Sequence, residues 1–110
     1  MYRVNIYPEA RADLFKLEAY LTQSFGHRIA NQKIKSLLDQ LDGLSYFPRL
    51  GKRVPQFVEM ESANLFTLQA GKNTVLYHVN DDQAVISIYA VIDIRSELIR
   101  AKAFFFRERD

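Results

Sequence analysis

The order in which the sequence patterns follow one another is the strongest constraint on the fold. Tyr2, Val4 and Ile6 alternate with polar residues, and this period of two predicts a half-buried strand. Two amphipathic segments with helical spacing follow, then a loop rich in proline, glycine and basic residues, and then apolar strand segments up to about Asp93. A β-α-α-loop-β-β-β order in 110 residues predicts one α+β domain spanning residues 1–110, because a chain of this length builds a single core.

The two amphipathic segments are expected to form an antiparallel helical hairpin. Pro8 suits the first turn of the first helix, where a missing N–H costs little, and Gly26 is placed to end that helix. The second helix starts near His27 and is ended by Pro48. The apolar stripes, which should pack against the sheet, consist of Ala10, Leu14, Leu17, Leu21 and Phe25 in the first helix and Ala30, Ile34, Leu37, Leu41 and Leu44 in the second.

The C-terminal half of the chain predicts consecutive strands joined by short turns. Residues 64–68, 74–79 and 84–92 have the composition of strands, and polar turn residues separate them. The last of these segments is apolar on both faces, which predicts a strand inside the sheet rather than at its edge. Tyr77 and Tyr89 fall in adjacent strands and are expected to pack in the core or across the strands.

A short C-terminal helix is expected after the last strand. Ile94, Leu98 and Ala101 have the spacing of its apolar side. Phe104, Phe105 and Phe106 follow, and three consecutive phenylalanines cannot all face one core. Two alternatives stay open for them: packing on the helical hairpin, or contact with a partner that covers them.

The residue types exclude several kinds of site. The chain has no cysteine, so disulfides and thiolate metal sites are excluded. It has no glycine-rich phosphate loop or metal-ligand spacing, and His27 and His78 have no partner spaced for a catalytic triad, so we expect no cofactor and no metal. The longest apolar run is too short to span a bilayer and the start lacks a signal-peptide pattern, which favours a cytoplasmic protein without membrane contact.

Basic residues gather in two places, although the formal net charge is only +2. Arg49, Lys52 and Arg53 lie in the loop after the second helix, and Arg95 and Arg100 belong to a basic C-terminal segment. Each cluster is either a solvated surface or a contact for an anionic partner, and the charges alone do not decide between these.

Four short sequence elements follow one another between Tyr2 and about Leu98. They are Tyr2-Arg3-Val4-x-Ile6-x-Pro8-x-Ala10-x-x-Asp13-Leu14, then Phe25-Gly26 with Ala30, then Pro48-x-x-Gly51-Lys52, and then Val75-Leu76-Tyr77-His78-Val79-Asn80-Asp81-Asp82. In this order the elements resemble a known superfamily, the RelE/ParE toxins of type II toxin–antitoxin systems. The resemblance implies an N-terminal strand and helical hairpin packed on a curved antiparallel sheet.

The superfamily contains two activities: RelE-like members cut messenger RNA on the ribosome, and ParE-like members inhibit DNA gyrase. Cutting RNA through its 2′-hydroxyl needs a group that activates this oxygen, cations for the phosphate and an acid for the leaving oxygen. By resemblance, the basic residues of RNA-cutting members would fall at Leu65, Thr67 and Gln69, an arginine at Thr74 and a tyrosine at Ile99. None of these residue types stands there, so the chain resembles the ParE branch and is expected not to be an enzyme.

The resemblance also implies partners. The expected target is DNA gyrase, contacted by Arg49, Lys52, Arg53, Arg95 and Arg100. A cognate antitoxin would neutralise the toxin in a higher-order complex and would alone touch operator DNA, its own segment lying over Leu14, Leu17, Leu21, Leu37, Leu41, Phe104 and Phe105. The alternatives are a RelE-like ribosome-dependent endoribonuclease and a non-toxic remnant that only binds its antitoxin.

Overall fold

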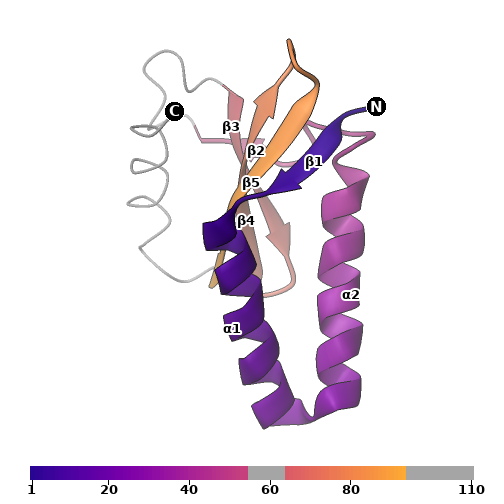
Figure 1. Ribbon diagram of the computed structural model, residues 1–110, viewed down its shortest axis with the longest axis vertical. Coiled ribbons are helices and arrows are strands. Elements are labelled where there is room, and N and C mark those ends of the chain that lie inside the picture. Colours follow the sequence, from indigo (N-terminus) through magenta and orange to yellow (C-terminus); the bar gives the residue numbers. More distant parts are fainter. Residues whose placement is uncertain (55–63, 94–110) are drawn as a thin grey trace.

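Two helices lie against one face of a five-stranded sheet in the computed structural model, which describes residues 1–54 and 64–93 (Figure 1). The strand order in the sheet is β1-β5-β4-β3-β2. This architecture confirms the predicted α+β class with its N-terminal strand and helical hairpin. The elements are β1 (Arg3–Ile6), α1 (Pro8–Phe25), α2 (His27–Gly43), β2 (Lys52–Arg53), β3 (Leu65–Ala70), β4 (Asn73–Asn80) and β5 (Val85–Asp93).

The sheet is antiparallel except at one edge. There β1 runs parallel to β5, with Arg3 opposite Val85 and Ile6 opposite Ile88, so the sheet is mixed. A parallel pair needs a long connection, and here the chain between the two strands includes the whole helical hairpin. The opposite edge is the two-residue strand β2, which the sequence pattern did not predict because two residues are too few to show a period.

Gly26 joins the two helices and acts at both of their ends. Its φ is 90°, a conformation that favours glycine, and its N–H donates to the Thr22 carbonyl at the end of α1. Its own carbonyl accepts from the Ala30 N–H at 3.1 Å in the first turn of α2. The predicted C-cap is therefore confirmed. The second helix ends earlier than expected, at Gly43, because the next residues form tighter turns before Pro48 is reached.

The core lies between the hairpin and the sheet. The predicted stripe residues Ala10 and Leu21 of α1 are buried, as are four from the second stripe, namely Ala30, Leu37, Leu41 and Leu44. Leu14 and Leu17 are half-buried against the same core. Phe25, in contrast, is 52% exposed, so its place in the packed stripe was predicted wrongly. The tip of the hairpin extends beyond the end of the sheet, and Phe25 is the last residue of α1 before that tip (Figure 1).

A second apolar cluster lies on the other face of the sheet. Leu65, Leu76, Tyr89 and Ala90 are buried there, whereas Tyr77 belongs to the cluster under the helices. Both tyrosines are thus core residues of adjacent strands, as predicted. Leu76 is opposite Ala90 while the next residue, Tyr77, is opposite Ile88, so β5 carries one extra residue in a β-bulge.

Several predictions fall on residues outside the described ranges. These are the short C-terminal helix around Ile94, Leu98 and Ala101, the basic residues Arg95 and Arg100, and the aromatic residues Phe104 and Phe105.

Candidate functional site

A groove of about 730 Å³ opens between the two helices and the turn that joins β3 to β4. Its floor is apolar because the buried sides of both helices and the ends of the strands meet there. The apolar residues that line it include Leu17, Leu21, Leu37, Ala70 and Val91. Three of the five helical leucines predicted to contact an antitoxin therefore line the groove, while Leu14 and Leu41 pack into the helix-facing core.

The rim of this groove is basic. Lys16 comes from α1, Lys33 from α2 and Lys72 from the β3–β4 turn, and all three are exposed. The Asp13 carboxylate also lines the groove. Because the three lysines outnumber this carboxylate, the described lining carries an excess of positive charge. A groove of this kind suits an extended or helical segment that combines apolar anchors with acidic residues.

Aromatic side chains complete the groove lining. Tyr20 is 61% exposed and Phe25 is 52% exposed, and both contribute to the groove. Large aromatic rings that are open to solvent beside an apolar floor are typical of surfaces that bind another protein. The exposed position of Phe25, which contradicts a purely structural role, becomes understandable in this setting.

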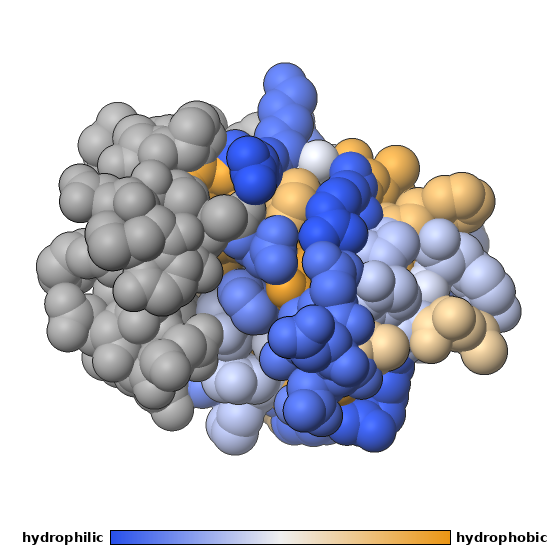
Figure 2. Space-filling view, turned by 90° about the horizontal axis from the view of Figure 1, so that it is seen from above, coloured by the Kyte–Doolittle hydropathy of each residue, from blue (hydrophilic) through white to orange (hydrophobic). Residues whose placement is uncertain are grey.

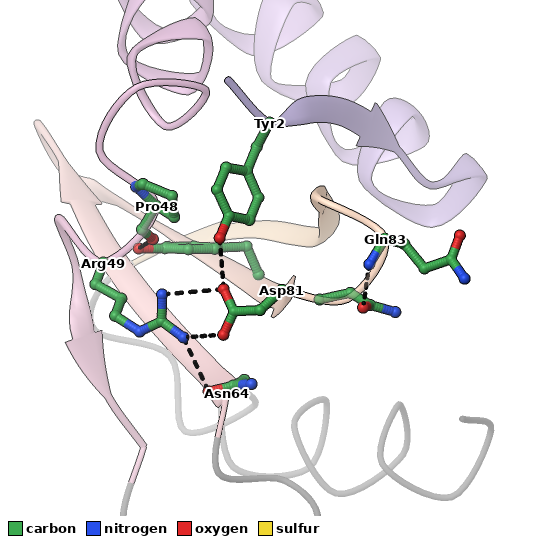
Figure 3. Close-up of polar contacts among 8 residues, drawn as sticks. Tyr2, Pro48, Arg49, Asn64, Asp81 and Gln83 are labelled. Carbon is green, nitrogen blue, oxygen red and sulfur yellow. Dashed lines mark hydrogen bonds and ion pairs between the residues drawn. The ribbon is translucent and has the colours of Figure 1, made fainter.

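The described residues place Arg49 in a polar network at the other end of the sheet (Figure 3). Its guanidinium forms an ion pair with Asp81 at 2.6 Å, and the Tyr2 hydroxyl donates to the same carboxylate, also at 2.6 Å. Arg49 donates further to the Asn64 side-chain oxygen at 3.4 Å. We refer to Tyr2, Arg49, Asn64 and Asp81 as the Asp81 cluster. It joins the N-terminus, the loop after α2, the start of β3 and the β4–β5 turn.

Electrostatics in the Asp81 cluster follow from these contacts. The hydrogen bonds from Arg49 and Tyr2 stabilise the charged carboxylate and hold the pKa of Asp81 below its usual value. The hydrogen bond from Tyr2 to Asp81 raises the pKa of the Tyr2 hydroxyl, because an ionised Tyr2 could not donate it and would face the negative charge of the carboxylate. Arg49 was expected to contact the target. The structure shows its charge engaged by Asp81, whereas Lys52 and Arg53 are exposed on the edge strand β2.

Tyr77 of β4 binds the backbone of the loop that follows α2. Its hydroxyl donates to the Pro48 carbonyl at 2.8 Å and accepts from the Gly51 N–H at 3.0 Å. Burial raises the pKa of this hydroxyl, which stays neutral and able to donate. The sequence predicted that Tyr77 is buried, and its hydrogen bonds to the loop were missed because residues 48–51 approach it only in the fold.

The sequence also missed the basic rim of the groove. Lys16, Lys33 and Lys72 come from three separate elements, so no local charge run reveals them. The partner of Arg49 was missed for the same reason, since Asp81 is 32 residues away along the chain.

The positions at which RNA-cutting relatives would carry their site lie on strands β3 and β4. Leu65 is 3% exposed and Thr74 is 7% exposed, so neither offers a charge or an accessible proton-transfer group. Thr67 is half-buried, Gln69 is exposed, and Ile99 lies outside the described ranges. Within residues 1–54 and 64–93 there is also no group of three His, Cys, Asp or Glu side chains that could hold a metal ion.

Solved structures of toxins and toxin–antitoxin systems are similar to this fold. The chromosomal ParDE system from P. aeruginosa matches with a TM-score of 0.69 and 18% identity, covering 86% of this chain and 98% of that one. The toxin–antitoxin complex RelBE2 from Mycobacterium tuberculosis matches with a TM-score of 0.59 and 24% identity, covering 84% and 96%. A mutant of the E. coli toxin RelE in the free state gives 0.61 and 16%, covering 96% of each chain. Identities this low establish the shared fold alone.

The sequence itself then decides the family. The model of the ParE toxin of type II toxin–antitoxin system, parDE, matches residues 4–97. The chain therefore belongs to the ParE toxin family, within the RelE/ParE superfamily that its sequence elements resemble. A comparison with curated proteins finds no match. In the part of the chain that the structure describes, no helix is both long and apolar enough to cross a membrane.

Proposed function

We propose that this protein is a cytoplasmic toxin that inhibits DNA gyrase by binding to it and carries out no chemistry of its own. The observation that supports binding over catalysis is that the positions on β3 and β4 where RNA-cutting members would carry their site lack the required side chains. Cleavage of RNA through the 2′-hydroxyl would need cations and proton-transfer groups there, and Leu65 and Thr74 are buried and uncharged. Membership of the ParE family supports gyrase as the target, because the resemblance of the sequence to ParE-like toxins implies gyrase inhibition.

A supercoiling assay with purified gyrase and relaxed plasmid tests this proposal. We expect the purified chain to inhibit supercoiling at micromolar concentration or below. Primer extension on translated messages provides the matching test for the ribonuclease alternative. Cuts at fixed codon positions together with unimpaired supercoiling would reject the gyrase proposal, and unaffected growth after induction without antitoxin would instead favour the non-toxic remnant.

The groove between the helices and the β3–β4 turn is the proposed binding site of the antitoxin, and we call it the antitoxin groove. Its apolar floor suits side chains at helical spacing, and its three lysines suit acidic residues between them. Such a segment is typically disordered when free and folds on binding. The groove engages only one segment of the antitoxin. The rest of the antitoxin would contact operator DNA in a higher-order complex.

Two charge reversals on the same helix test whether the antitoxin binds in this groove. Lys33 lines the groove, whereas Lys35 does not and forms an exposed ion pair with Asp39 at 3.3 Å. Lys33→Glu should weaken binding of the antitoxin encoded beside the toxin gene by about tenfold or more, because it places like charges in contact. Lys35→Glu should leave the affinity within about twofold. Equal affinities for the two variants would reject the groove as the binding site of the antitoxin.

A further inference from the structure

The loop that follows α2 presents three large apolar side chains to solvent. Tyr46 is 67% exposed, Phe47 is 65% exposed and Leu50 is 57% exposed. The Leu50 N–H donates to the Phe47 carbonyl at 3.1 Å, a turn that brings these two residues close together. We call these three residues the apolar tip. Figure 2 shows hydrophobic surface at the upper right of the molecule, on the side where α2 lies in Figure 1.

The apolar tip is held in place by bonds on both sides of it. Before the tip, the Tyr2 N–H donates to the Ser45 carbonyl at 2.9 Å and the Ser45 hydroxyl donates back to the Tyr2 carbonyl at 2.5 Å. At its far end, Tyr77 binds the backbone of Pro48 and Gly51, and the Arg49–Asp81 ion pair lies between. The exposure of the tip is thus built into the fold. A surface ordered in advance loses little conformational entropy when it binds.

The charge around the apolar tip favours a protein partner over a nucleic acid. A nucleic-acid site needs an excess of cations to replace the counterions of the phosphates. Here the exposed charges of the loop and the strand β2 that follows it, of the end of α2 and of the adjoining β4–β5 turn are balanced. They are Arg49, Lys52 and Arg53 on one side and Asp42, Asp81 and Asp82 on the other.

The apolar tip is separate from the antitoxin groove. The groove is lined by Asn73 at one end of β4, whereas the Asp81 cluster that supports the tip lies just beyond the other end. At about 3.3 Å per residue these two positions are roughly 25 Å apart. None of the groove-lining residues belongs to the loop, so a segment bound in the groove leaves the tip exposed.

We propose that the apolar tip is the surface with which this toxin contacts its target, by inserting Phe47 and Leu50 into an apolar pocket of a larger protein. This inference rests on the proposed function. Three side chains of this exposure offer on the order of 400 Å², which matches a local anchor in a pocket. A stable dimer of this chain would need about 800 Å² from each copy, so the tip is too small to be a dimer interface.

Two phenylalanines of equal exposure provide a matched test. Phe47 is 65% exposed in the tip and Phe15 is 66% exposed on α1, outside both the tip and the groove. Phe47→Ser and Phe15→Ser should both fold and bind the antitoxin as the parent does. Phe47→Ser should raise the concentration that half-inhibits gyrase about tenfold or more, and Phe15→Ser should change it less than about twofold. Equal potency of the two variants, whether both retain or both lose it, would overturn the inference.

Growth arrest after induced expression separates this inference from the choice of target. If the parent arrests growth without inhibiting gyrase, and Phe47→Ser alone relieves the arrest, the tip is the contact surface and the proposed target is wrong. If gyrase is inhibited equally by the parent and Phe47→Ser, the proposed function stands and the tip is rejected. A parent chain that neither arrests growth nor inhibits gyrase overturns both.

Discussion

The Asp13 carboxylate accepts a hydrogen bond from the backbone N–H of Val91 at 2.9 Å and so fixes α1 to the sheet. The edge strand β1 covers β5 only from Val85 to Ile88. Beyond that point the side chain of Asp13 takes the place of the missing strand as an acceptor for β5. Since Asp13 and Val91 both line the groove between the helices and the β3–β4 turn, the same bond sets the distance between two of its walls.

Asp13→Ala should therefore destabilise the protein by about 1–3 kcal/mol, because a partly buried N–H loses its acceptor. Asp13→Asn keeps a carbonyl oxygen at the same place and should lose clearly less. Urea unfolding followed by circular dichroism measures both variants. Equal losses for alanine and asparagine would show that the hydrogen bond to Val91 does not hold α1 in place.

A methyl group at Gly51 has no room in this fold. A Cβ there would lie 2.3 Å from the backbone oxygen of Thr67 and 3.0 Å from the Tyr77 hydroxyl. Gly51→Ala should displace the loop and cost about 1–3 kcal/mol in the free energy of unfolding. Gly43→Ala is the control, because nothing lies within 4 Å of its added Cβ, and alanine should stabilise the helix end by about 0.5–1 kcal/mol. A neutral effect at Gly51 would contradict the close approach to Thr67.

The Asp81 cluster should give the stability a specific dependence on pH. The pKa of Asp81 is lower in the folded state than its ordinary value of 3.8, so its stabilising effect is complete above that value. The effect should be lost as the pH falls through the lower, folded value. Asp81→Asn should flatten this part of the profile, measured as the urea midpoint between about pH 6 and about pH 2. Asp82→Asn, which removes a charge from the same turn but no bond of the cluster, should leave the profile close to that of the parent.

Removal of the Tyr77 hydroxyl should loosen the loop without disturbing the core. Tyr77→Phe keeps the ring, which stacks on Phe66 at a centroid distance of 5.5 Å, but loses the bonds to Pro48 and Gly51. We expect a loss of about 1–3 kcal/mol and faster hydrogen exchange at the Gly51 amide. Phe66→Leu, which removes the stacked ring and keeps the hydroxyl, should reduce stability while the Gly51 amide keeps most of its local protection. The same exchange rate at Gly51 in Tyr77→Phe and the parent would contradict the role of the hydroxyl.

Much of the fold could be predicted from local patterns. The helical spacing of apolar residues located both helices, and Gly26 between them marked the turn that a positive φ requires. The alternation in the first strand predicted its half-buried character correctly, and the fully apolar segment near Ile88 predicted a strand inside the sheet correctly. These features depend on neighbours within a few residues, which a single sequence contains.

Features that depend on distant residues could not be predicted. The parallel pairing of β1 with β5 and the Arg49–Asp81 ion pair each join segments far apart along the chain. The exposure of Phe25 depends on where the sheet ends relative to the hairpin, which its helical spacing does not reveal. The apolar tip was missed because Tyr46, Phe47 and Leu50 have ordinary spacing for a helix end and show their exposure only in the fold.

The most direct test of whether this chain acts by occupying its target is titration of the toxin against a fixed concentration of gyrase. If the toxin acts by occupancy, the loss of supercoiling should follow the fraction of gyrase bound and level off near molar equivalence when both proteins are well above the dissociation constant. Unimpaired supercoiling at a molar excess of toxin, with traces of the same preparation cleaving messages on translating ribosomes, would contradict this mode of action.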